Sequence, residues 1–159
     1  MALRTVTLTL NGKSQALSVD RQATSLNVLR NDFQLNSPKY GCGLDECSAC
    51  TVLIDGVAAR ECVIPASGVD GRCITTLEGS GTFENLHPTQ QAFIDIQAAQ
   101  CRYFLSGMIM MTAALLGRNP NPLVADIHGE LSGNLCRCGT HIEIVQTVQH
   151  AAVLIKQAA

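Results

Sequence analysis

Tryptophan is absent from the 159 residues, aromatic residues make up only 4% of them, and charged residues only 15%. Lysine and arginine form no cluster and the formal net charge is −2, so we expect no nucleic-acid partner. The longest strongly apolar stretch, residues 107–117, is too short to cross a bilayer, and no direct membrane span is expected. The N-terminal residues alternate between polar and apolar types and lack the apolar core of a signal peptide.

Cysteine, by contrast, is abundant, with eight in the chain. A small protein without an export signal seldom holds a disulfide framework, so the count favours metal or redox chemistry. The length suits one ordinary domain or two small ones, and small domains often need a metal or a partner for stability.

The N-terminal half reads as a strand-rich sheet with one helix. Residues 3–10 alternate, and Asn11-Gly12 is a hairpin turn leading to a return strand over 14–19. Ser25 is expected to cap a helix that reaches Phe33. Further strands are expected over residues 51–54, 57–63 and 73–77, with a linker over 79–82.

The C-terminal half reads as four helices. Pro88 suits a first helical turn, and an apolar helical face follows it to residue 99. Further helices are expected over 108–116 and 123–131, separated by a proline-rich break. Thr140 and Glu143 form a capping-box pattern that begins the last helix.

Four cysteines in the first half have metal-ligand spacing. Cys42, Cys47 and Cys50 follow the pattern C-x4-C-x2-C, and Cys62 lies further along the chain, as in plant-type [2Fe–2S] ferredoxins. Glycines at 41 and 43 let the backbone approach a cluster and direct N–H groups at its sulfurs. A structural zinc site also takes four thiolates, but it usually uses paired C-x2-C motifs, and only Cys47 and Cys50 form one here.

The second half carries Cys101 and the run Cys136-Arg137-Cys138-Gly139. With these motifs the chain resembles the small iron–sulfur subunit of molybdenum hydroxylases, the xanthine oxidase-like family. The similarity favours the group that includes nicotinate dehydrogenase, isoquinoline 1-oxidoreductase and membrane-bound aldehyde dehydrogenase. The matching segments follow the family's order over nearly the whole chain: residues 39–43, 47–52, 74–79, 86–88, 100–101, 107–110 and 134–140.

This resemblance implies an α+β fold: a plant-type ferredoxin β-grasp domain over 1–79, then a four-helix bundle domain over 80–159. It implies a second [2Fe–2S] cluster on the helical half and, as the partner, a large molybdopterin subunit. The Gln100 and Cys138 positions would lie near the partner's pterin, and this chain would hold no catalytic residue. Relatives in the resembling group often deliver electrons to a c-type cytochrome, and this chain carries no flavin-binding motif, so the resemblance implies a c-type cytochrome subunit or domain as the electron acceptor.

The second motif departs from the family at two positions. Phe104 stands where a ligand cysteine is expected, and Arg102 stands where a glycine lets the loop pass close to the cluster. Cys101, Cys136 and Cys138 remain at ligand spacing, so the second cluster is either lost, retained with another fourth ligand, or altered. Ser106, Cys73, a histidine or a group from the partner are the candidate replacements.

The expected function is electron transfer within a molybdopterin-dependent hydroxylase or dehydrogenase that oxidises an aldehyde or an N-heterocycle. A free-standing ferredoxin-like carrier is the alternative, although it has no need for the helical half. A structural metal module is a third reading. The chain suits the cytoplasm, or a membrane-associated periplasmic complex if it is exported with a partner.

Overall fold

The computed structural model describes residues 3–158, so residues 1 and 159, the outer bounds of the two expected domains, lie outside it. The N-terminal half contains one five-stranded mixed sheet with the strand order β2-β1-β5-β3-β4. Its pairs are antiparallel except β1 with β5, which is parallel. The strands are β1 (Leu3–Leu10), β2 (Lys13–Asp20), β3 (Thr51–Ile54), β4 (Val57–Arg60) and β5 (Cys73–Thr75).

The first hairpin forms as its sequence predicts. Val6, Leu8 and Leu10 alternate into the core of the sheet and are 1%, 2% and 7% exposed. Asn11 and Gly12 both have positive φ, 50° and 79°, which suits a tight two-residue hairpin turn. Alternation along one strand therefore determines which face of the sheet is buried.

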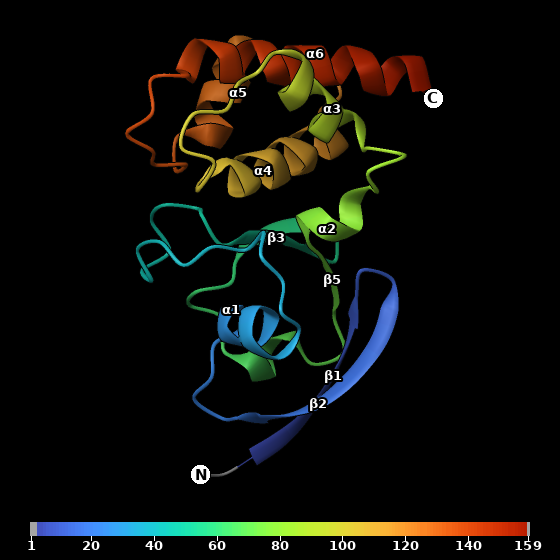
Figure 1. The fold of residues 1–159 in the computed structure, drawn as a ribbon, viewed down its shortest axis with the longest axis vertical. Coiled ribbons are helices and arrows are strands. Elements are labelled where there is room, and N and C mark those ends of the chain that lie inside the picture. The colour runs from blue at the N-terminus through green and yellow to red at the C-terminus, as the bar shows by residue number, and fades with distance from the viewer. Residues whose placement is uncertain (1–2, 159) are drawn as a thin grey trace.

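A short helix lies beside the sheet, to the left of β5 in Figure 1, as α1 (Ser25–Asn27) and continues in the π-helical turn η1 (Val28–Asp32). The expectation that Ser25 caps this helix was wrong by one residue. Thr24 Oγ1 accepts the N–H of Asn27 at 3.3 Å, whereas Ser25 is buried and its N–H donates to the Ile64 carbonyl.

Two strands end earlier than expected. β4 stops at Arg60 because the Glu61 carbonyl accepts the N–H of Leu26, at 3.2 Å, and so turns the chain away from the sheet toward α1. β5 stops at Thr75, and the helix α2 (Leu77–Ser80) follows it. Part of the expected linker is thus helical, since the Thr76 N–H donates to Asn11 Oδ1 and places Thr76 at the N-cap.

Four longer helices form the second half, as expected: α3 (Pro88–Asp95), α4 (Leu105–Arg118), α5 (Val124–Leu131) and α6 (His141–Ala158). The expectation that the first of them reaches residue 99 was wrong, because Gln97 takes a left-handed backbone conformation with φ 53° and the helix ends at Asp95. A 3-10 turn, η2 (Ala66–Val69), is the remaining helical element of the sheet half. Figure 1 shows α4 between the sheet and the other helices, with α6 on the far side. Within residues 3–158, no helix combines the length and apolar character needed to span a membrane.

Separate apolar cores stabilise the two halves. One lies around the sheet and η1, and the others lie among α3, α4, α5 and α6. The halves meet where α4 lies against the backbone that precedes β3. Gly107 of α4 sits so close to this backbone that a Cβ there would lie 2.0 Å from the Ser48 carbonyl oxygen.

Candidate metal centres

The outer cysteine loop, which we define as residues 39–50, joins η1 to β3 and carries three of the expected ligands. Cys47 and Cys50 are buried and Cys42 is half-buried. Cys62 reaches the same place from the turn after β4 and packs against Cys50 and Leu26. The structure thus brings together the four cysteines that the sequence selects.

Backbone N–H groups surround the first two sulfurs. Cys42 Sγ accepts from the N–H groups of Leu44, Glu46 and Cys47 at 3.3–3.4 Å, and Cys47 Sγ accepts from Cys42 N–H at 3.2 Å. The hydrogen bonds from Leu44 and Glu46 lower the pKa of the Cys42 thiol to about 7. A sulfur in this environment is readily deprotonated and suited to binding a cation.

The other two sulfurs lie deeper. Burial raises the pKa of Cys50 to about 12, and the neighbouring Cys62 thiol adds to the rise. The four thiols therefore form two adjacent pairs, 42 with 47 and 50 with 62. Two pairs suit a cluster of two irons with two terminal thiolates each.

The backbone beside the outer pair leaves no room for a side chain. A Cβ at Gly41 would lie 2.5 Å from Cys47 Sγ and 3.2 Å from Ala49 Cβ. Gly43 has φ +71°, a conformation that glycine adopts without strain. The paired thiols, the N–H donors and this close approach fit a [2Fe–2S] cluster.

Sequence reasoning missed one buried charge beside this site. Glu61 directly precedes Cys62 and is fully buried, and neither of its carboxylate oxygens has a hydrogen-bond partner among the described residues. Burial raises the pKa of its carboxyl group to about 7, and the nearby Ser25 side chain offsets part of this rise. In the sequence Glu61 looked like an ordinary strand residue, and only the turn after β4 directs it inward.

The helical half gathers Cys101, Cys136 and Cys138, whose Sγ atoms all lie within 4.8 Å of one another. The Sγ atoms of Cys101 and Cys136 are 3.5 Å apart. N–H groups of Tyr103, Cys138 and Cys101 each donate to one of the three sulfurs. Hydrogen bonds from Phe104 and Tyr103 lower the pKa of Cys101 to about 7, whereas burial raises that of Cys136 to about 11.

None of the replacement ligands considered from the sequence within this chain joins this trio. Cys73 lies exposed on β5, and its N–H donates to Asp55. The Ser106 hydroxyl donates to the Ser37 carbonyl at 2.5 Å. Within residues 3–158, no histidine or acidic side chain completes the group.

Phe104 lies between the two centres. It immediately precedes α4, and its ring packs into the apolar cluster that includes Met108, Ile144 and Cys136. The same ring would be 3.4 Å from a Cβ placed at Gly41 in the outer cysteine loop. Its neighbour Tyr103 donates its hydroxyl to the Tyr40 carbonyl at 2.5 Å.

Further hydrogen bonds join the two centres. The Leu135 N–H donates to the Cys47 carbonyl, and the Ser48 hydroxyl donates to the Gly133 carbonyl at 2.9 Å. On the opposite side, Gln100 Oε1 accepts the N–H of Gly139 at 3.1 Å, which positions the loop after Cys138. Hydrogen bonds therefore tie the outer cysteine loop directly to the segment that precedes Cys136.

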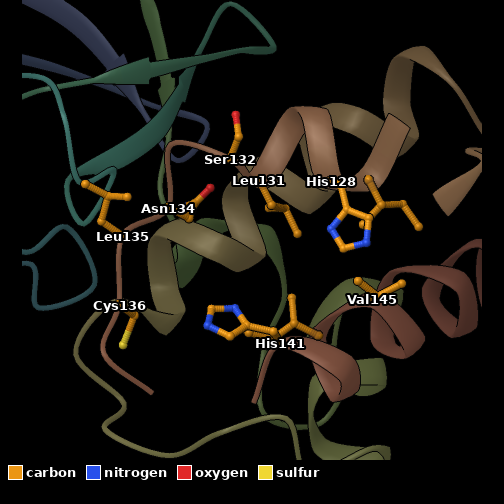
Figure 2. A pocket seen from close by; sticks show the side chains of 10 residues that line it. His128, Leu131, Ser132, Asn134, Leu135, Cys136, His141 and Val145 are labelled. Atoms are coloured by element: carbon orange, nitrogen blue, oxygen red, sulfur yellow. The ribbon is translucent and has the colours of Figure 1, made fainter. Parts of the chain in front are cut away.

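A hollow between α5 and α6 adjoins this region. Its cavity volume is about 280 Å³, and Figure 2 shows His128 and His141 on its wall with Cys136 at one edge. Asn134 also lines it, and both of its amide atoms are buried without a partner among the described residues. Neither histidine belongs to the three-thiol group.

Two family models match consecutive parts of the chain. Residues 8–75 match a 2Fe-2S iron-sulfur cluster binding domain, and residues 76–149 match a [2Fe-2S] binding domain. Together they cover most of the sequence.

Curated proteins and solved structures agree with these matches. A nicotinate dehydrogenase subunit of Pseudomonas putida is 59% identical over 148 residues, covering 93% of this chain and 94% of the relative. The alpha subunit of isoquinoline 1-oxidoreductase from Brevundimonas diminuta is 44% identical over 151 residues, covering 94% of this chain and 97% of that relative. A crystal structure of quinoline 2-oxidoreductase from Pseudomonas putida superimposes with a TM-score of 0.92 and 31% identity, covering 98% of this chain and 97% of that one.

Proposed function

Because the chain belongs to the family of small [2Fe–2S] subunits of molybdenum hydroxylases, we propose that it transfers electrons within a complex that oxidises an N-heterocycle or an aldehyde. The observation that carries the proposal is the set of four outer thiols, which lie in two pairs, with backbone N–H donors around the sulfurs of Cys42 and Cys47. The relative at 59% identity is named for nicotinate, which favours an N-heterocycle as the substrate of the complex.

A bound [2Fe–2S] cluster supplies one-electron acceptance and release. Cys42, Cys47, Cys50 and Cys62 would hold it. The N–H groups of Leu44 and Glu46 place partial positive charge beside the sulfur of Cys42 and would favour the more negative, reduced state. Burial of Cys50 and Cys62 keeps water from the inner side of the site.

The partner would be a large subunit that carries the molybdopterin. The loop of Cys138, positioned by Gln100, is the part of this chain that we propose faces the pterin. Leu135 and Ile142 flank this loop and are 55% and 71% exposed, so a docked subunit would cover apolar side chains there. We propose a c-type cytochrome as the acceptor, and a flavin subunit in the purified complex would contradict this part.

The test is anaerobic purification of the full chain, coexpressed with the chains encoded beside it, followed by addition of an N-heterocyclic substrate such as nicotinate. We expect a large molybdenum-containing chain to copurify and the substrate to bleach the visible absorption of the small subunit. Cys62→Ser should abolish the outer cluster, whereas Cys73→Ser, at an exposed cysteine outside both centres, should leave it unchanged.

An iron-free, colourless wild-type chain would overturn the proposal. A chain that purifies alone, contains iron and undergoes reversible one-electron reduction would instead support the free-standing carrier. Electron paramagnetic resonance after reduction distinguishes these outcomes, because it detects the reduced cluster directly.

A further inference from the structure

The helical half has too few ligands for the cluster that its family model names. Residues 76–149 match a [2Fe-2S] binding domain, yet they contain only three cysteines, Cys101, Cys136 and Cys138. Such a cluster takes four terminal protein ligands. We propose that these three thiolates bind a single thiophilic metal ion of the Zn²⁺ type in place of a second [2Fe–2S] cluster.

The spacing of the sulfurs suits one ion. All three Sγ atoms lie within 4.8 Å of one another, and the closest pair is 3.5 Å apart. Thiolates at about 2.3 Å from a tetrahedral zinc ion lie roughly 3.8 Å from one another. In the described part of the chain, no three of the four outer sulfurs gather this closely. The two centres therefore differ in geometry, and only the helical one has the spacing of a mononuclear site.

Among residues 3–158, no histidine, cysteine or acidic side chain supplies a fourth ligand. Phe104 fills the space beside the sulfurs with an apolar ring that packs against Met108 and Ile144. The hollow that these residues line has a cavity volume of about 10 Å³. That is roughly the space of one water molecule, which suits the three-ligand zinc sites whose fourth ligand is a water.

Charge at the site agrees with a divalent ion. Each sulfur accepts one or more backbone N–H groups, an arrangement that stabilises thiolates. Three thiolates and one divalent cation leave a net charge of about −1. Arg102 lines the same hollow and brings a positive charge to it. Its backbone holds φ 62°, a conformation uncommon for a residue with a side chain.

Binding would exchange protons for metal. The ion replaces the thiol protons of Cys101, Cys136 and Cys138, which leave to solvent, and no oxidation occurs. Zinc has no accessible redox states, so the helical centre would take no part in electron transfer and the outer centre alone would exchange electrons. This inference concerns the metal content of this chain and does not depend on the identity of its partner.

The decisive measurement is the content of iron, acid-labile sulfide and zinc in the full chain purified anaerobically. We expect about two irons and two sulfides, all from the outer centre, and about one zinc per chain. Cys136→Ser should remove the zinc and leave the iron unchanged, and the matched control Cys73→Ser should change neither. In zinc-free protein, added Co²⁺ should give thiolate-to-cobalt absorption that Cys136→Ser lacks.

Four irons and four sulfides per chain, with two distinct reduced-cluster signals, would overturn the inference. So would two irons with no bound zinc and no response to added Zn²⁺ or Co²⁺. Loss of all iron together with retained zinc would contradict the proposed function and still support this inference. The two proposals therefore fail on separate measurements.

A second variant tests why the cluster is excluded. Phe104→Cys combined with Arg102→Gly supplies a fourth thiol and removes the side chain from the left-handed position. This double variant should raise the iron content about twofold and lose the zinc. A double variant whose iron content stays at the wild-type level would contradict the argument that the missing thiolate excludes the cluster.

Discussion

Gly107 of α4 lies directly against the backbone of the outer cysteine loop, so a single methyl group there tests how the two halves of the protein pack. In Gly107→Ala the new Cβ would lie 2.0 Å from the Ser48 carbonyl oxygen and 3.4 Å from Ala49 Cα. Both neighbours are backbone atoms, which cannot rotate away as a flexible side chain could. Because real Cβ contacts stay beyond 3.0 Å, α4 or the loop must retreat by about 1 Å.

The magnitude follows from two opposed effects. Overpacking of a tightly packed contact costs about 1–3 kcal/mol. Alanine in a helix interior is more favourable than glycine by about 0.5–1 kcal/mol, which offsets part of this cost. We therefore expect Gly107→Ala to lower the free energy of unfolding by up to about 2 kcal/mol. Because the displaced loop carries Cys47 and Cys50, the visible circular dichroism of the cluster should change as well.

The assay is urea unfolding followed by far-ultraviolet circular dichroism, with Gly117→Ala as the matched control. Gly117 lies on the same helix, and a Cβ added there would meet no atom within 4 Å, so this variant should gain about 0.5–1 kcal/mol. If the two variants were equally stable and showed the same cluster spectrum, the close packing of α4 on the loop would be refuted.

Three further predictions concern the loop and its supports. Glu78 accepts the hydroxyl groups of Ser37 and Thr76 and the N–H of Ser37, and these hydrogen bonds outweigh burial and hold the pKa of its carboxyl group below the usual value of 4.5. Glu78→Gln should therefore cost about 1–2 kcal/mol at neutral pH, and urea titrations should show this difference shrinking as the pH falls through the lowered pKa. Arg102→Gly should raise the free energy of unfolding by about 1 kcal/mol, because it relieves the left-handed backbone at φ 62°, and a lower thermal midpoint would contradict this. Gly41→Ala should reduce the iron content of the chain, since its Cβ would lie 2.5 Å from Cys47 Sγ, whereas Gly129→Ala, with open space around it, should keep full iron.

Sequence reasoning located most elements but not their ends. The strand over 3–10 and the turn at Asn11-Gly12 were predictable because both depend on neighbouring residues. The ends of β4 and β5 were not predictable, because each is set by a hydrogen bond to a distant segment. The Leu26 N–H donates to the carbonyl of Glu61 just after β4, and the Thr76 N–H just after β5 donates to Asn11. The N-cap at Thr24 was missed for the same reason, since Ser25 is engaged by the Ile64 carbonyl.

The sequence by itself determined the family and the closeness of Cys42, Cys47 and Cys50, because ligands separated by two to four residues in one loop must lie close together. The turn after β4 then brings Cys62 to the same place. Only the tertiary structure decided which residues surround the second centre. It brought Cys101 beside Cys136 across 35 residues, kept Cys73 and Ser106 away, and packed the Phe104 ring into the remaining space. Distances between such remote segments depend on how α3, α4 and α6 pack, and no local spacing encodes that.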